Sequence, residues 1–106
     1  MKEFLKGNDI TINWTLPTAV SPVSYANGEL YVYGGTCRFN IDVTLQGNVL
    51  QGVIGGELLP TGFYSLEYIY NYKDGDKTVH RRIKKGLCFA VTEDETDNEF
   101  VLILGV

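Results

Sequence analysis

The chain has 106 residues, a hydrophobic content of 44%, a charged content of 21% and a formal net charge of −4. This length suits one domain with one modest core, and it is too short for a two-domain enzyme with an interdomain cleft. No apolar run approaches the ~20 residues of a membrane-spanning helix, and the negative charge argues against binding to a phosphate backbone. We therefore expect a single domain over residues 1–106, with neither a membrane nor a nucleic acid as its partner.

The order of apolar and polar residues favours an all-β chain. Twelve glycines and seven tyrosines point to short strands and tight turns, and no apolar stripe with the helical period of 3.6 residues is present. The first predicted strand, residues 9–16, places Ile10, Ile12 and Trp14 on its inward face. Prolines interrupt the pairing after it, and Asn27-Gly28 is predicted as a turn.

The next predicted strands differ in exposure. Residues 30–33 are apolar on both faces, which is typical of a strand with two covered sides or of an oligomer contact. Residues 37–45 alternate strictly, so one of their faces is predicted to be wet. A turn at Gly47-Asn48 then returns the chain as residues 49–54, with Leu50 facing Leu45, Ile54 facing Ile41, and Gly52 marking a bulge or a close backbone approach.

Residues 62–91 are predicted to form one long β-hairpin that turns at Asp74-Gly75. Alternation gives the hairpin an inward face made of Tyr64, Leu66, Tyr68, Tyr70 and Tyr72. The register that sets apolar residues opposite one another pairs Tyr70 with Val79, Leu66 with Ile83, and Glu67 with Arg82. A shift by one residue would place Leu66 against Lys84 and bury a charge.

The last predicted strand is Phe100–Leu104, which follows an acidic loop over residues 93–99. The total of seven short, regularly spaced strands favours a two-sheet antiparallel sandwich over a barrel, although the pattern separates these two architectures weakly. The predicted core contains Trp14, Phe39, Ile41, Leu66, Tyr68 and Phe89.

No pattern of reactive residues indicates catalysis or a metal site, so we expect a non-enzymatic chain without a cofactor. The single histidine, His80, lacks the partner ligands of a zinc site and is interpreted as a surface residue opposite Ile69. The beginning of the sequence lacks the apolar run of a secretory signal, so we expect synthesis in a cytoplasm, where Cys37 and Cys88 stay reduced. Cys88 also neighbours apolar residues and is interpreted as structural.

Three further groups of residues have both a functional and a structural interpretation. The basic segment 77–85 suggests an anion-binding patch, but its cations alternate between faces and fit a charged strand protected from edge pairing. The acidic run 93–99 offers oxygen ligands for calcium, yet it lacks the glycine and spacing of a known calcium loop. The tyrosines suit either a sugar-binding platform or, more economically, a buried core or interface.

Four segments carry a likeness to a known family that covers nearly the whole chain: Asn8-Asp9-Ile-x-Ile-x-Trp-x-Leu16, Leu30-Tyr-Val-Tyr33, Gly47-Asn-Val-Leu50 and Gly62-Phe-Tyr-Ser-Leu-Glu67. In their order they resemble the N-terminal domain of phage baseplate-upper-protein-like structural proteins, particularly the type carried in Bacteroides phages and prophages. The resemblance implies an immunoglobulin-like sandwich that docks a tail fibre or receptor-binding part onto the virion. The entry to the long hairpin, Gly62-Phe-Tyr64, also resembles the start of the corresponding strand in immunoglobulin-like sandwiches, which predicts a corner tyrosine at Tyr64.

We therefore expect a structural protein of a phage particle, made in the bacterial cytoplasm and then part of the virion, that contacts itself or other phage proteins. A homo-oligomer is the expected form, with interface candidates Tyr31, Tyr33, Phe100, Val101, Leu102, Ile103 and Leu104. An uncharged terminal strand is an aggregation hazard unless a partner covers it, but Phe100–Leu104 is also consistent with a central strand buried on both faces. A carbohydrate- or surface-binding module with exposed aromatic residues is the alternative function.

Overall fold

The computed structural model describes residues 2–17, 25–93 and 100–105. All nine regular elements in this part of the chain are β-strands. They are β1 (Lys2–Leu5), β2 (Ile10–Thr15), β3 (Asn27–Gly34), β4 (Cys37–Ile41), β5 (Val43–Gln46), β6 (Val49–Ile54), β7 (Gly62–Asp74), β8 (Lys77–Thr92) and β9 (Val101–Leu104). The chain is therefore all-β, as predicted.

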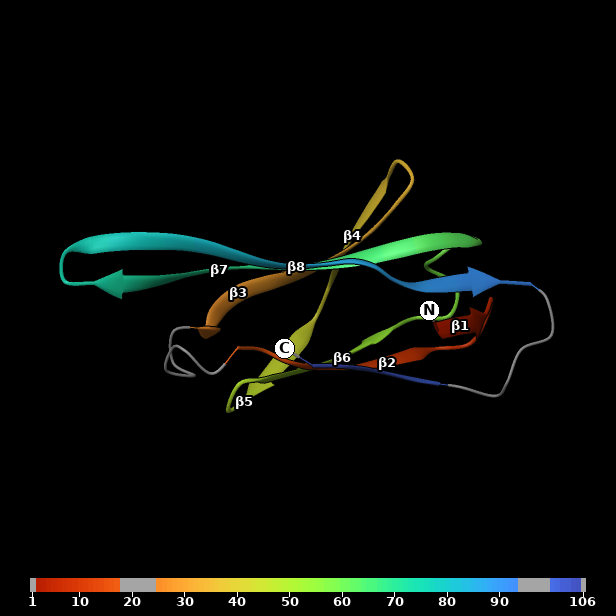
Figure 1. Cartoon of the computed structure of the whole chain (residues 1–106), viewed down its shortest axis with the longest axis horizontal. Coiled ribbons are helices and arrows are strands. Elements are labelled where there is room, and N and C mark those ends of the chain that lie inside the picture. Colours follow the sequence, from red (N-terminus) through yellow and green to blue (C-terminus); the bar gives the residue numbers. More distant parts are fainter. Residues whose placement is uncertain (1, 18–24, 94–99, 106) are drawn as a thin grey trace.

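The strands form two sheets that lie as layers in Figure 1. One sheet has five strands in the order β1-β8-β7-β3-β4, and the other has four in the order β5-β6-β2-β9. The segment predicted as one strand over residues 37–45 is divided at Asp42, where the chain passes from the first sheet to the second. Its alternation continues across this crossing, because Asp42 stays exposed while Ile41 is buried and Val43 half-buried.

Both sheets are mixed, so the predicted purely antiparallel arrangement is wrong. β1 pairs in parallel with β8, from Lys2 opposite Phe89 to Leu5 opposite Thr92. β9 pairs in parallel with β2, and every other pair of neighbouring strands is antiparallel in the described residues. The strand β1 was missed, because four residues with one buried side chain, Phe4, carry too little alternation to be recognised.

The core lies between the sheets and consists of the inward side chains of both. Trp14, Leu66 and Phe89 are fully buried, and Ile41 and Tyr68 are at most 4% exposed, as predicted. Phe39 is only partly buried, because β4 is an edge strand of its sheet. The five buried residues confirm the inward faces assigned from alternation.

The predicted hairpin is confirmed as β7 and β8, but its register differs by two residues from the prediction. Gly75 occupies the first position of the two-residue loop with a φ of +62°, the position where a type II′ turn places glycine. Asp74 therefore pairs with Lys77, and Leu66 lies opposite Lys85 instead of Ile83. The side of the strand that each residue faces is unchanged, because a two-residue shift preserves the alternation.

The tip of the hairpin extends beyond the body of the sandwich (Figure 1). β3 pairs with β7 only as far as Asn71, so the strands between Tyr72 and Val79 have each other as their sole strand neighbours among the described residues. The molecule is accordingly elongated, with principal extents of 51 × 26 × 19 Å for the described part.

Tyr64 confirms the predicted corner. Its hydroxyl donates to the carbonyl of Pro60 at 2.5 Å, which ties the start of β7 to the connection that precedes it. The ring is 2% exposed and stacks on Phe89 with centroids 5.4 Å apart. Gly34 lies directly beneath this ring, where a Cβ would approach a ring carbon to 2.2 Å.

The turn predicted at Asn27-Gly28 is wrong, because both residues belong to β3. The glycine serves close packing instead: a Cβ on Gly28 would lie 2.3 Å from the ring of Tyr68. The Tyr68 hydroxyl donates to the Tyr25 carbonyl, and the Tyr25 ring meets Tyr70 edge-on. These contacts place buried tyrosines where the middle of β7 meets the start of β3.

The predicted turn at Gly47-Asn48 is confirmed, and Leu45 lies opposite Leu50. Ile54 does not face Ile41, however. It pairs with Ile10 of β2, because Ile41 belongs to β4 and pairs with Leu30 in the other sheet. Gly52 permits a close approach, since a Cβ there would lie 2.8 Å from the Asp42 carbonyl.

Candidate interaction surfaces

Strand β9 is an edge strand of the four-stranded sheet. Leu102 packs into the core at 2% exposure, whereas Val101 and Ile103 point outward at 40% and 68%. Phe100, directly before the strand, is 48% exposed. The alternative of a central strand buried on both faces is therefore wrong.

The open side of β9 has no strand partner among the described residues. Thr11 N–H donates to the Phe100 carbonyl at 2.7 Å, which fixes the side of β9 that faces β2. Alternate residues of a strand bond the same neighbour, so the backbone groups of Val101 and Ile103 face away from β2. On this side the Lys2 ammonium donates to the Val101 carbonyl at 3.4 Å. The edge is thus uncharged in its own side chains and accessible to another strand.

Tyr31 and Tyr33 lie on the outer face of the five-stranded sheet, away from β9. The Arg38 guanidinium stacks over the Tyr31 ring at 3.8 Å from its centroid and lies 5.6 Å from that of Tyr33. Lys84 approaches Tyr33 from β8, with its ammonium 5.9 Å from the ring centroid. Both tyrosine rings are half-buried in this way by cationic side chains, which occupy positions where a ligand would stack.

Glu67 is buried on this outer face, although alternation predicts that it is wet. It is 4% exposed, and its carboxylate accepts a hydrogen bond from the Tyr33 hydroxyl. The Arg82 guanidinium lies 3.7 Å from the other carboxylate oxygen. Burial and the hydrogen bond to Glu67 raise the pKa of Tyr33 above its usual value. The cluster of Tyr33, Glu67 and Arg82 was missed because it depends on pairing across three strands.

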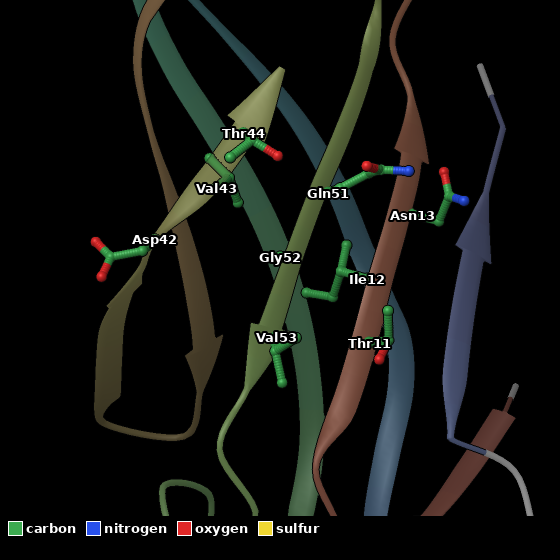
Figure 2. A pocket seen from close by; sticks show the side chains of 9 residues that line it. All are labelled: Thr11, Ile12, Asn13, Asp42, Val43, Thr44, Gln51, Gly52 and Val53. Atoms are coloured by element: carbon green, nitrogen blue, oxygen red, sulfur yellow. The ribbon is translucent and has the colours of Figure 1, made fainter. Parts of the chain in front are cut away.

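A shallow groove of about 530 Å³ crosses the outer face of the four-stranded sheet. Figure 2 shows its lining, with the amide side chains of Asn13 and Gln51 on neighbouring strands. These two residues are directly paired between β2 and β6. Gly52 lies in the middle of the groove, and Val53 adds an apolar side chain that is 53% exposed. The groove offers hydrogen-bonding amides and hydroxyls without an aromatic surface.

The reactive residues are dispersed. His80 is exposed and lies opposite Asn71, not Ile69, because of the shifted register. Cys37 and Cys88 are both free thiols and half-buried, and burial raises the pKa of Cys88 to about 11. In the ranges that the structure describes, no three His, Cys, Asp or Glu side chains gather as metal ligands would. Of the acidic run, residues 94–99 lie outside the described residues, and Glu93 pairs with Lys6 at 3.5 Å.

None of the described residues belongs to a helix with the length and apolar character needed to cross a lipid bilayer.

The predicted interface residues thus form two separate groups. Val101 and Ile103 are exposed on one sheet edge, with Leu102 behind them in the core, while Tyr31 and Tyr33 lie on the other sheet. Comparison with known proteins adds no candidate: no protein-family model matches the chain, and no curated protein or solved structure matches it significantly. The functional argument therefore depends on the geometry of the chain itself.

Proposed function

We propose that this chain is a non-enzymatic β-sandwich domain of a phage or prophage particle that assembles with itself or with other particle proteins through strand β9. The observation that carries the proposal is the open edge of β9, where Val101 and Ile103 are exposed and no further strand pairs with the backbone among the described residues. Natural edge strands are usually protected by charge, proline or a bulge; Val101–Leu104 contains none of these, and the charge on this edge comes from Lys2 at Val101 alone among the described residues. Pairing with another strand would cover both its backbone and its apolar side chains.

The proposed fold type is immunoglobulin-like, and the strand order supports it. β3, β7 and β8 lie in the order of strands C, F and G of such domains, and β2, β6 and β5 in the order of B, E and D. The bond from Tyr64 to Pro60 has the form of the tyrosine corner at the start of strand F. Two features depart from that fold: Trp14 lies on β2 instead of β3, and β9 occupies the place of strand A.

The phage assignment is supported by the resemblance to phage baseplate-upper-protein-like domains, whose motifs fall on β2, β3, β6 and the start of β7. Mass spectrometry of phage particles purified from the source strain tests it. We expect the chain as a stoichiometric component of the particle, and particles that lack it would contradict the assignment.

Sedimentation velocity tests assembly through β9. Between about 1 and 200 µM we expect one larger species whose population falls on dilution. Ile103→Lys, which adds a charge to the open edge, should shift the protein to monomer. Phe63→Lys is the matched control, because Phe63 is 63% exposed but lies on β7 of the other sheet. A monomer at every concentration, or equal effects of both variants, would contradict self-assembly through β9.

A second candidate function, binding of a neutral carbohydrate, is favoured by the groove around Asn13 and Gln51. Paired amides and nearby hydroxyls suit the hydrogen bonding of sugar hydroxyls. A glycan array with Gln51→Ala and Tyr33→Ala variants separates the groove from the tyrosine face. Binding that is lost with Gln51→Ala alone would favour the groove, and no binding to any glycan would remove this candidate.

A further inference from the structure

Strand β8 forms a second open edge. Its residues include several lysines and arginines, whereas β9 contains no charged residue. β7 covers one side of β8 along the hairpin, whereas β1 covers the other side only from Phe89 to Thr92. Among the described residues, no strand pairs with that other side between Lys77 and Gly86. Ten residues of extended chain thus have one free side, about 33 Å long at 3.3 Å per residue.

Backbone N–H and C=O groups on this edge point outward, where they could pair with another strand. The Arg81 guanidinium donates to the carbonyl of His80 at 3.0 Å, so that carbonyl is directed away from β7. In an antiparallel ladder the N–H and C=O of one residue point to the same side, so the His80 N–H also faces outward. The bond from Arg81 is exposed and would be replaced by an incoming strand.

We define the basic edge as the five cations of this segment, out of nine in the chain: Lys77, Arg81, Arg82, Lys84 and Lys85. Within the described part of the chain, the one ion pair made by these residues is that of Arg82 with Glu67. The other four have no carboxylate partner among the described residues, in a protein whose formal net charge is −4. The register places Lys77, Arg81 and Lys85 on the inward face of β8 and Arg82 and Lys84 on its outer face, so an added strand would meet cations on both of its faces.

We propose that the free side of β8 binds an extended acidic segment of a partner polypeptide, which adds to the five-stranded sheet as a further strand. Backbone pairing would supply affinity, and the cations would select carboxylate side chains in the added strand. The same charges repel the β8 edge of a second copy, so this surface discriminates against self-pairing. It is a separate surface from β9 and goes beyond the proposed self-assembly.

Binding of such a partner would also stabilise the hairpin. Between Tyr72 and Val79 it is a two-stranded ribbon outside the body of the sandwich, and isolated two-stranded ribbons are marginally stable in water. A third strand would also cover Val79 and Ile83, which are half-buried on the inward side of β8. A nucleic acid fits the surface less well, because it cannot pair with the strand backbone and the Tyr31 ring is already covered by Arg38.

The direct test is fluorescence anisotropy with a labelled peptide of alternating Glu and Val, about eight residues long. We expect saturable binding at least about tenfold tighter than that of the same peptide with Lys in place of Glu. N-methylation of alternate amides on one side of the peptide should abolish binding, because it removes the backbone pairing and keeps the charge. These two probes use the unaltered protein, so folding of a variant is not in question.

Two matched pairs of variants locate the site. His80→Pro removes the outward N–H and should weaken binding at least about tenfold relative to His80→Ala, which removes only the side chain. Lys84→Glu should weaken binding about fivefold or more. Lys6→Glu makes the same charge change at the far end of β8, beside Thr92, where β1 already covers the edge, and should not weaken binding. Equal binding of the Glu and Lys peptides, insensitivity to N-methylation, or tighter binding of oligothymidylate than of the acidic peptide would each overturn the proposal.

Discussion

The buried carboxylate of Glu67 allows a sharp test with two neighbouring tyrosines. Tyr33 and Tyr31 lie on the same strand and the same face, and each hydroxyl donates to a glutamate. The acceptor of Tyr33 is Glu67, at 4% exposure, whereas the acceptor of Tyr31 is the exposed Glu29. Tyr33→Phe therefore deprives a buried charge of its hydrogen bond, and Tyr31→Phe removes a bond that water replaces.

A hydrogen bond to a charged group contributes about 1.5–3 kcal/mol, and the low end applies because Tyr33 is itself only half-buried. Arg82 stays 3.7 Å from Glu67, beyond hydrogen-bond distance, so it replaces little of what is lost. We expect Tyr33→Phe to lower the free energy of unfolding by about 1.5 kcal/mol. For a chain of 106 residues this corresponds to a fall in Tm of roughly 7 °C.

Urea titrations followed by tryptophan fluorescence measure the free energy of unfolding of Tyr33→Phe and of the unaltered protein. Tyr31→Phe is the control, and we expect its urea midpoint to be unchanged. A double-mutant cycle assigns the loss to the pair: after Glu67→Gln, the effect of Tyr33→Phe should fall below about 1 kcal/mol. Equal midpoints for Tyr33→Phe and Tyr31→Phe would refute the reasoning, since burial of the acceptor would then have no energetic consequence.

Four further outcomes follow from the core and from groups with raised pKa. Leu66→Ala should cost roughly 2–5 kcal/mol in urea unfolding, because a fully buried side chain leaves a cavity; less than about 1 kcal/mol would mean that the site collapses. Tyr64→Phe should cost about 1 kcal/mol by the same assay, and no change would show that the corner bond is replaced by water. Burial raises the pKa of Tyr68 above 10.0, so the folded state holds that proton more tightly, and the contribution of Tyr68 to stability should be constant below about pH 10 and be lost above it; in a Cys88→Ala background, equal urea midpoints at pH 8 and pH 11 would contradict this. In a Cys37→Ser variant, alkylation of Cys88 by iodoacetamide should be slow at pH 8 and accelerate toward its raised pKa of about 11, whereas a fast reaction at pH 8 would mean an accessible thiolate.

Local features of the sequence predicted the strands and their faces well. The limits of the long hairpin, the turn at Gly47-Asn48 and the corner bond of Tyr64 all depend on residues close together in the chain. The hairpin register was missed because both registers keep the same faces, and the two possible turns differ only in the position of Gly75. Lys84 opposite Leu66 was expected to bury a charge. Lys85 occupies that position instead, and β8 is an edge strand there, so the ammonium can reach water.

Non-local features were the ones that alternation could not supply. The parallel pairing of β1 with β8 joins residues more than eighty positions apart, and no pattern within Lys2–Leu5 encodes it. A bulge between Tyr64 and Leu66 also shifts the register within the hairpin, and Leu87 adopts a φ of +41° there. A leucine in the left-handed region is uncommon, so this bulge had no signal in the sequence. The surface cluster around Glu67 likewise needed the order of β3, β7 and β8 to be known.

The two parallel pairings determine how the domain carries mechanical load. Tension that enters at the start of β1 and leaves at the end of β9 pulls each of these strands along its own length against a parallel neighbour. In that geometry the hydrogen bonds between the strands are sheared together, whereas an antiparallel hairpin pulled at its open end separates one bond at a time. Resistance to rupture is then a property of the unfolding barrier, not of equilibrium stability. A domain with this strand arrangement is suited to a position under tension, where its lifetime under force matters more than its free energy of unfolding.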